Sequence, residues 1–159
     1  MKLHAPQPLT ADHHLNTFNC GETSLDEWLK RRALLNQANG ASRTFVVVDE
    51  SQLVMGYYAL AAGAVHHQDA MRSIRQNMPD PIPVMVLARL AVDIRTQGMQ
   101  LGAGLLRDAV DRSLAVAKNT GVRALLVHAL HERAKQFYLY FGFQASPVHP
   151  LTLMLRLKA

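Results

Sequence analysis

The segment from Val84 to Lys118 constrains the fold of this 159-residue chain more than any other feature. Val84 to Val92 is strongly apolar and β-prone, and Arg89 is its only charged residue. A glycine-bearing loop follows. The longest helical pattern then runs from about Gln100 to Lys118, and its apolar residues recur with the 3.6-residue period of a helix. A strand that leads through a loop into a helix predicts an α/β fold.

The rest of the chain adds helices and strands, so we expect one mixed α/β domain over residues 1–159. Ser24-Leu25-Asp26-Glu27 has the form of a capping box, which predicts a helix from Ser24 to the stop signal Asn39-Gly40. Residues 1–20 are expected to be rich in loops. The other expected elements are strands at Thr44–Asp49, Leu53–Ala61, Val122–Leu130 and Leu151–Lys158 and a helix at Glu132–Phe141.

Composition and charge narrow the classes of function. No run of 18 or more purely apolar residues occurs, so we expect no membrane span. The first ten residues lack the pattern of a signal peptide, and the single Cys20 cannot form an internal disulfide, so we expect a cytoplasmic protein. A net charge of +5 and a pI near 9.7 favour anionic partners such as nucleic acid or phosphorylated cofactors.

The loop between the apolar strand and the long helix has the features of an anion site. Leu90-Ala91-Val92 ends the strand, and residues 97–104 lead into the helix. The first N–H groups of a helix have no partner within it, the helix dipole adds positive potential, and glycines allow a phosphate to approach the backbone. Alternatively, Gly98, Gly102 and Gly104 only permit a tight turn and close packing. The loop matches neither a P-loop nor a Rossmann fingerprint.

A second segment, Phe137-Tyr138-Leu139-Tyr140-Phe141-Gly142-Phe143, follows after one helix and one strand. Together with Gln97-Gly98-Met99-Gln100-Leu101-Gly102 it resembles the GNAT superfamily of acyl-CoA N-acetyltransferases. That family pairs an Arg/Gln-x-x-Gly-x-Gly/Ala pyrophosphate loop with a downstream Phe-Tyr-x-x-x-Gly-Phe helix. Gln100 stands where the loop motif has its first glycine. At a helix N-terminus we expect Gln100 to take ordinary helical dihedrals.

More narrowly, residues 8–157 resemble the GNAT toxins of bacterial type II toxin–antitoxin modules. The segments that carry this resemblance are Cys20-Gly21-Glu22, Leu25 to Leu29, Arg43 to Val47, Gly56 to Leu60, Ile82-Pro83-Val84 and Leu87 to Asp93. Such toxins use acetyl-CoA to acetylate the free α-amine of an aminoacyl-tRNA, which blocks translation. The resemblance implies this activity here, with glycyl-tRNA as one candidate acceptor. It also implies a cognate ribbon-helix-helix antitoxin and a homodimer.

The resemblance implies that a central mixed sheet is flanked by helices and that acetyl-CoA lies between two splayed strands, one ending at Val92 and one near Ala129. Main-chain groups of the first strand would bind the pantetheine amides, as an added strand would. The implied cofactor-binding residues are Leu90, Ala91, Val92, Gln97, Gly98, Met99, Gln100, Leu101, Gly102, Ala103, Gly104, His131 and Phe137. For His131, a solvated turn residue is an equal alternative.

Tyr138 matches the position of the family's general acid. A tyrosine hydroxyl, with a pKa near 10, can protonate a departing thiolate. The alternative is a buried tyrosine that anchors its helix through a hydroxyl hydrogen bond. Attack by an amine on a thioester needs no covalent enzyme intermediate, so Cys20 is not required as an acyl carrier. The general base remains open, because an α-amine with a pKa of about 8 has a neutral fraction without help.

Candidate contacts to tRNA are Lys30, Arg31, Arg75 and Arg89, although a solvated surface position is the alternative for each of them. Arg89 differs from the others because a charge inside an apolar strand needs a partner or a ligand. Three pairs of histidines lack the spacing of a zinc site, so we expect no metal. They are His13-His14, His66-His67 and His128-x-x-His131.

Two other functions stay open at this point. One is a GNAT enzyme acting on a protein N-terminus, a polyamine or another small amine. The other is an acyl-CoA-binding module without activity. The basic charge balance favours RNA over a polyamine, and Tyr138 argues against a module that only binds.

Overall fold

The computed structural model describes residues 1–158 and confirms the mixed α/β class. Seven strands form one mixed sheet in the order β1-β2-β3-β4-β5-β7-β6. The chain divides into two compact units. The first unit comprises residues 1–61 and 88–109, and the second comprises residues 62–87 and the chain from Val110 onward. No helix in the described part of the chain is both long and apolar enough to span a bilayer.

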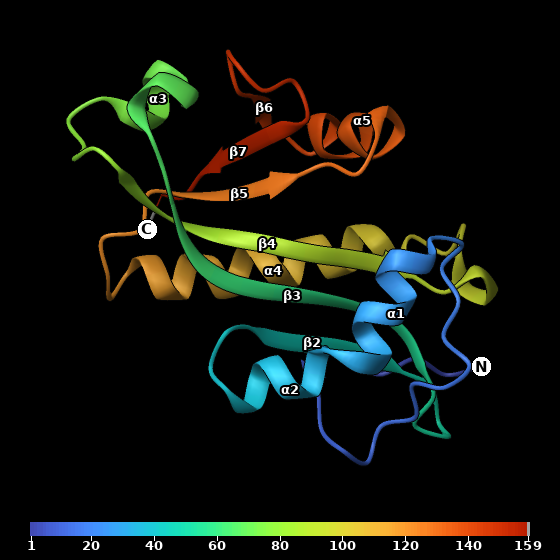
Figure 1. Cartoon of the computed structure of the whole chain (residues 1–159). Coiled ribbons are helices and arrows are strands. Elements are labelled where there is room, and N and C mark those ends of the chain that lie inside the picture. Colours follow the sequence, from blue (N-terminus) through green and yellow to red (C-terminus); the bar gives the residue numbers. More distant parts are fainter. Residues whose placement is uncertain (159) are drawn as a thin grey trace. The chain divides into compact units, whose positions relative to one another are not determined.

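The first unit is built on the antiparallel hairpin of β2 and β3, with β1 paired to the outer side of β2. In Figure 1, α1 and α2 pass in front of these strands. Leu29 of α1, Val46 of β2 and Tyr57 of β3 are fully buried in its core. The elements of this unit are β1 (Gln7–Pro8), α1 (Thr23–Arg31), α2 (Ala33–Ala38), β2 (Arg43–Val48), the first part of β3 (Val54–Val65), the end of β4 (Ile82–Val92), the 3-10 turn η2 (Ile94–Thr96) and the first half of α4 (Leu101–Ala117).

The N-terminal helix differs from the expectation of one helix that begins at Ser24. Two helices are present, separated by Arg32 with φ −119° and ψ −28°. The capping-box prediction is wrong because α1 already begins at Thr23, and the carboxylate of Glu27 pairs with Arg31 on the next turn. The predicted stop is confirmed, since α2 ends just before Asn39-Gly40.

The second unit is built around β5, which pairs in parallel with β4 and antiparallel with β7. Ile74, Ile82, Leu126 and Met154 are buried in its core. The elements of this unit are the end of β3, the 3-10 turn η1 (His67–Asp69), α3 (Arg72–Arg75), the start of β4, the end of α4, β5 (Ala124–His128), α5 (Glu132–Tyr140), β6 (Gln144–Ala145) and β7 (Thr152–Arg156).

The ladder between β4 and β5 stops before the end of β4. It joins Met85–Leu87 to Leu125–Val127, whereas β4 continues to Val92. Within residues 1–158, the stretch Ala88–Val92 therefore has no ladder partner on β5. Main-chain groups along an unpaired strand edge can bind an extended chain as a further strand would.

Candidate active site

The loop that leads from β4 into α4 presents a row of free main-chain donors. Within residues 1–158, no acceptor is found for the backbone N–H groups of Gln97, Gly98, Gln100, Leu101, Gly102 and Ala103. These residues are exposed or half-buried, and the helix that they enter has 17 residues. Free N–H groups at the start of a long helix, reinforced by its dipole, suit a phosphate or pyrophosphate.

Gln100 takes φ +59° and not the ordinary helical dihedrals expected from the sequence. The expectation is wrong because α4 begins only at Leu101, so Gln100 belongs to the turn before the helix. Gly98 in the same turn has φ +84°. The chain thus uses two left-handed residues to pass from η2 into α4, and one of them carries a Cβ atom that disfavours this conformation.

We expect the substitution Gln100→Gly to raise the free energy of unfolding by about 0.5–1 kcal/mol, because glycine adopts a left-handed conformation without a Cβ clash. Urea denaturation measures this difference. Gln52, with φ +66° in the β2–β3 turn, is a matched control. Gln52→Gly should raise the free energy of unfolding by a similar amount, because it removes the same Cβ clash at a second left-handed position. A Gln100→Gly variant that is no more stable than the parent would show that the loop holds Gln100 without strain.

Asp93 fixes the start of this loop. Its carboxylate is fully buried and accepts the backbone N–H of Asn19 at 3.0 Å and that of Arg95 at 2.9 Å. It also accepts two guanidinium hydrogen bonds from Arg95, at 2.8 and 2.9 Å. Burial alone would raise the pKa of Asp93, but the hydrogen bonds and the charge of Arg95 bring it below its ordinary value. Sequence reasoning missed this anchor, although the Asp93-x-Arg95 spacing was visible.

Gln97 holds the loop from its other side. Its side-chain amide donates to the carbonyl oxygens of Cys20 and Val92, both at 3.2 Å. Because the side-chain amide is already hydrogen-bonded, the group of Gln97 that is free to contact a cofactor is its backbone N–H. The Cys20 thiol is a poor nucleophile, because burial and a hydrogen bond with Asp26 raise its pKa to about 12. This supports the expectation that Cys20 is not an acyl carrier.

Tyr138 lies in α5 and is only 6% exposed. Its ring contacts those of Phe137 and Phe143, with centroids 5.2 and 5.4 Å apart. Burial raises the pKa of its hydroxyl above the ordinary value of about 10, so the hydroxyl is a proton donor at physiological pH. Within residues 1–158 this hydroxyl has no hydrogen-bond partner. Its oxygen atom is not fully buried, so it does not count as a buried polar atom without a partner. The hydrogen bond expected of a purely anchoring tyrosine is therefore not seen.

His131 is the N-cap of α5. Its Nδ1 accepts the backbone N–H of Ala134 at 3.1 Å, which fixes the start of the helix that carries Tyr138. The side chain thereby satisfies one of the backbone N–H groups that have no acceptor within the helix. Phe137, the other predicted cofactor contact in α5, packs between Tyr138 and Phe141.

The four predicted tRNA contacts do not gather in one unit. Lys30 and Arg31 are exposed on α1, and Arg89 of β4 belongs to the same unit. Arg75 belongs to the second unit, where its Nη1 donates to the carbonyl of Ala70 at 2.8 Å. It lines a hollow of about 470 Å³ together with His67, Gln68 and Pro147. Among the described residues, no group of three or more His, Cys, Asp or Glu side chains could hold a metal ion.

Comparison with known proteins extends the resemblance over nearly the whole chain. A tRNA-acetylating toxin of Mycobacterium tuberculosis is 49% identical over 154 residues, which cover 97% of this chain and 92% of that protein. No protein-family profile matches the chain.

Two solved structures share the fold. AtaT complexed with acetyl-methionyl-tRNAfMet has a TM-score of 0.90 and 28% identity, over 98% of this chain and 95% of that one. AtaTR bound with AcCoA has a TM-score of 0.82 and 29% identity, over 97% of this chain and 93% of that one. Since nearly half of its residues are identical to those of a tRNA-acetylating toxin along almost the full length of both, this chain belongs to the tRNA-acetylating toxins of the GNAT superfamily.

Proposed function

We propose that this chain transfers the acetyl group of acetyl-CoA to the α-amine of an aminoacyl-tRNA and thereby blocks translation. The observation that carries the proposal is the set of free backbone N–H groups at Gln97, Gly98 and residues 100–103, which suits a pyrophosphate. The acceptor is supported by the relative named for tRNA acetylation and by AtaT, which was captured with acetyl-methionyl-tRNAfMet. Glycyl-tRNA is one candidate acceptor.

The proposed roles follow from the chemistry of the groups. The free N–H groups of Gln97, Gly98 and residues 100–103 hold the pyrophosphate of acetyl-CoA, and the edge of Leu90–Val92 that has no partner on β5 binds the pantetheine amides. The amine nitrogen attacks the thioester carbonyl, the carbon–sulfur bond breaks, and Tyr138 gives its proton to the departing thiolate. The nitrogen releases one proton to solvent as the amide forms, and the Tyr138 hydroxyl regains one proton from solvent. The amine is neutral in part at physiological pH, because an α-amine has a pKa of about 8.

The remaining predicted contacts keep the roles assigned from the sequence. We propose that Ala91, Met99, Gly104, His131 and Phe137 contribute to the acetyl-CoA site. Lys30, Arg31, Arg75 and Arg89 contact tRNA phosphates, because each presents a cation on an exposed or half-buried surface.

The proposed biological setting is a toxin–antitoxin module in the cytoplasm. AtaTR is a relative solved with bound AcCoA, and the wider resemblance supports a cognate ribbon-helix-helix antitoxin for this chain. We further propose that residues 1–159 act as one GNAT domain and that the toxin forms a homodimer.

The decisive experiment incubates the pure protein with labelled acetyl-CoA and total charged tRNA and then identifies the labelled species. We expect the label on aminoacyl-tRNA, whereas uncharged tRNA binds without being acetylated because it lacks the amine. Label on a protein N-terminus or a polyamine, with none on aminoacyl-tRNA at low salt, would contradict the proposed acceptor and leave the acetyltransferase fold intact.

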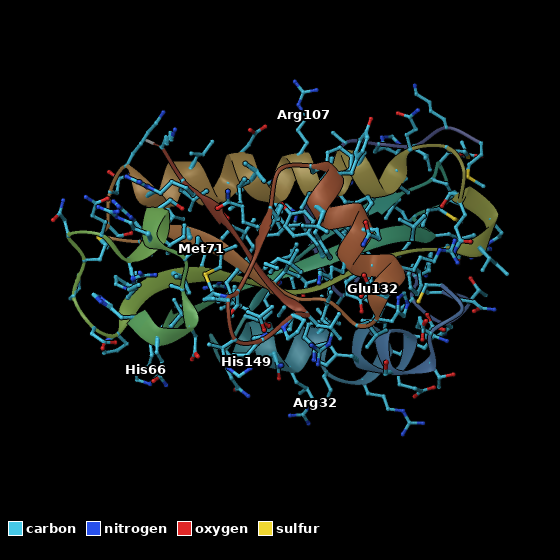
Figure 2. The ribbon with its side chains drawn as sticks, turned by 90° about the horizontal axis from the view of Figure 1, so that it is seen from above. Arg32, His66, Met71, Arg107, Glu132 and His149 are labelled. Atoms are coloured by element: carbon cyan, nitrogen blue, oxygen red, sulfur yellow. The ribbon has the colours of Figure 1, made fainter. Side chains whose placement is uncertain are left out.

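Phosphate contacts make tRNA binding steeply dependent on salt, because each one releases condensed counterions. We expect the double variant Arg75→Gln and Arg89→Gln to reduce the slope of log affinity against log salt by about 2. Its acetyl-CoA affinity should stay unchanged. Filter binding of uncharged tRNA measures the slope. Arg107 is the matched control, because it is exposed and points away from α4 (Figure 2). If Arg107→Gln reduced the salt slope by about 1, as much as each substitution in the double variant, the assignment of Arg75 and Arg89 as phosphate contacts would be wrong.

A further inference from the structure

Arg89 has an unusual environment for a charged side chain in an apolar strand. Its guanidinium carbon lies 4.9 Å from the centroid of the Trp28 ring, a cation–π geometry. Its Nη1 donates to the carbonyl of Ala88 at 3.0 Å. Among the described residues, its other N–H groups have no acceptor and no carboxylate pairs with it. A half-buried guanidinium with most of its donors unused is suited to an anionic ligand.

Trp28 is itself held in place. Its ring stacks on Tyr57 with an interplanar angle of 10° and a centroid separation of 6.0 Å. The Tyr57 hydroxyl donates to the carbonyl of Leu25 at 2.7 Å, one turn before Trp28 in α1. The Phe18 ring also packs against Tyr57, with centroids 5.5 Å apart and an interplanar angle of 69°. The indole therefore has a fixed position relative to the strand that carries Arg89.

We propose that Trp28 is a positioning residue for the acceptor: it holds the Arg89 guanidinium in the orientation that binds a tRNA phosphate. This inference rests on the proposed function and assigns a role to a residue that does not itself contact the RNA. The aromatic face takes one side of the planar guanidinium and uses none of its N–H donors. A carboxylate partner would fix Arg89 equally well, but it would compete with the phosphate for those donors.

The experiment compares Trp28→Leu, Trp28→Phe and Arg89→Gln. Trp28→Leu should raise KM for charged tRNA about tenfold and reduce the salt slope of uncharged-tRNA binding by about 1, the equivalent of one phosphate. KM for acetyl-CoA should change less than twofold. Trp28→Phe keeps an aromatic face and should retain most of the tRNA affinity. In a double-mutant cycle, Trp28→Leu should add little to Arg89→Gln, because the first change acts through the second residue.

Additive effects of Trp28→Leu and Arg89→Gln, or an equal rise in both KM values, would overturn the proposal. Because Trp28 is part of the core of its unit, thermal unfolding accompanies each assay. If Trp28→Leu fails to fold, Arg89→Lys tests the same idea. It keeps the charge but loses the planar face, and it should weaken tRNA binding nearly as much as Arg89→Gln, whereas full retention of affinity would refute the role of stacking. If the parent protein acetylates no aminoacyl-tRNA, the proposed function fails, and uncharged-tRNA binding still tests Trp28 on its own.

Discussion

We expect turnover to fall about 100-fold or more in a Tyr138→Phe variant, the usual scale for the loss of a general acid, while acetyl-CoA affinity should stay unchanged. The hydroxyl is protonated at physiological pH, because burial raises its pKa. Its removal should leave no buried group without a partner, since it has no hydrogen bond within residues 1–158. The ring packing against Phe137 and Phe143 is retained by phenylalanine. The loss should therefore appear in kcat and not in stability.

Tyr140 provides the control for this experiment. It lies on the same helix but is 84% exposed, so Tyr140→Phe should keep full activity. Single-turnover kinetics measures the chemical step, calorimetry measures acetyl-CoA binding, and growth after induced expression reports toxicity. Growth inhibition should disappear with Tyr138→Phe and persist with Tyr140→Phe. An equally active Tyr138→Phe variant would move the general acid to another residue.

Gly102→Glu should weaken acetyl-CoA binding at least 100-fold, roughly the effect of losing a charge-assisted phosphate site and introducing a like charge. Gly102 lies in the first turn of α4, where its N–H is one of the free donors. The new carboxylate would occupy neighbouring donors and repel the pyrophosphate. The fold should survive, because an acidic side chain in the first turn interacts favourably with the helix dipole.

Gly121→Glu is the matched control, because it adds the same charge at an exposed glycine around which a side chain finds open space. Isothermal titration calorimetry should give parental acetyl-CoA affinity for Gly121→Glu and no measurable heat for Gly102→Glu. If both variants bind acetyl-CoA as the parent does, the pyrophosphate does not bind at residues 97–103.

Local sequence patterns predicted most of the elements but not how their ends are built. The periodicity of the long helix, the strands predicted at Thr44–Asp49 and Leu53–Ala61 and the stop at Asn39-Gly40 are all confirmed. The break at Arg32 and the left-handed Gln100 were missed. At both positions the local sequence is compatible with ordinary helical dihedrals as well as with the conformation observed. The Glu27–Arg31 ion pair accompanies the break at Arg32, and the turn that follows η2 accompanies the left-handed Gln100.

The features of the candidate site likewise fall into those that a local motif predicts and those that depend on residues far away in the sequence. The glycine loop and Tyr138 follow from short motifs, because backbone donors and a phenol carry their chemistry wherever the motif folds. The Asp93 anchor depends on Asn19, and the position of Arg89 depends on Trp28, in both cases across a long stretch of sequence. The Asn19–Asp93 and Trp28–Arg89 contacts are set by packing of the folded chain, so no local pattern could have predicted them, whereas the Asp93–Arg95 pair has a local spacing that was visible.

The edge of Ala88–Val92 that has no ladder partner on β5 has a consequence for handling and storage of the protein. An unpaired strand edge is a template for other chains, and proteins that leave one open are prone to self-association. On the proposed function, bound acetyl-CoA would cover this edge with its pantetheine arm. Cofactor supply would then govern colloidal behaviour as well as catalysis: a preparation kept with the thioester should remain monodisperse longer than one stripped of it, and the amide protons of this stretch should exchange with solvent more slowly.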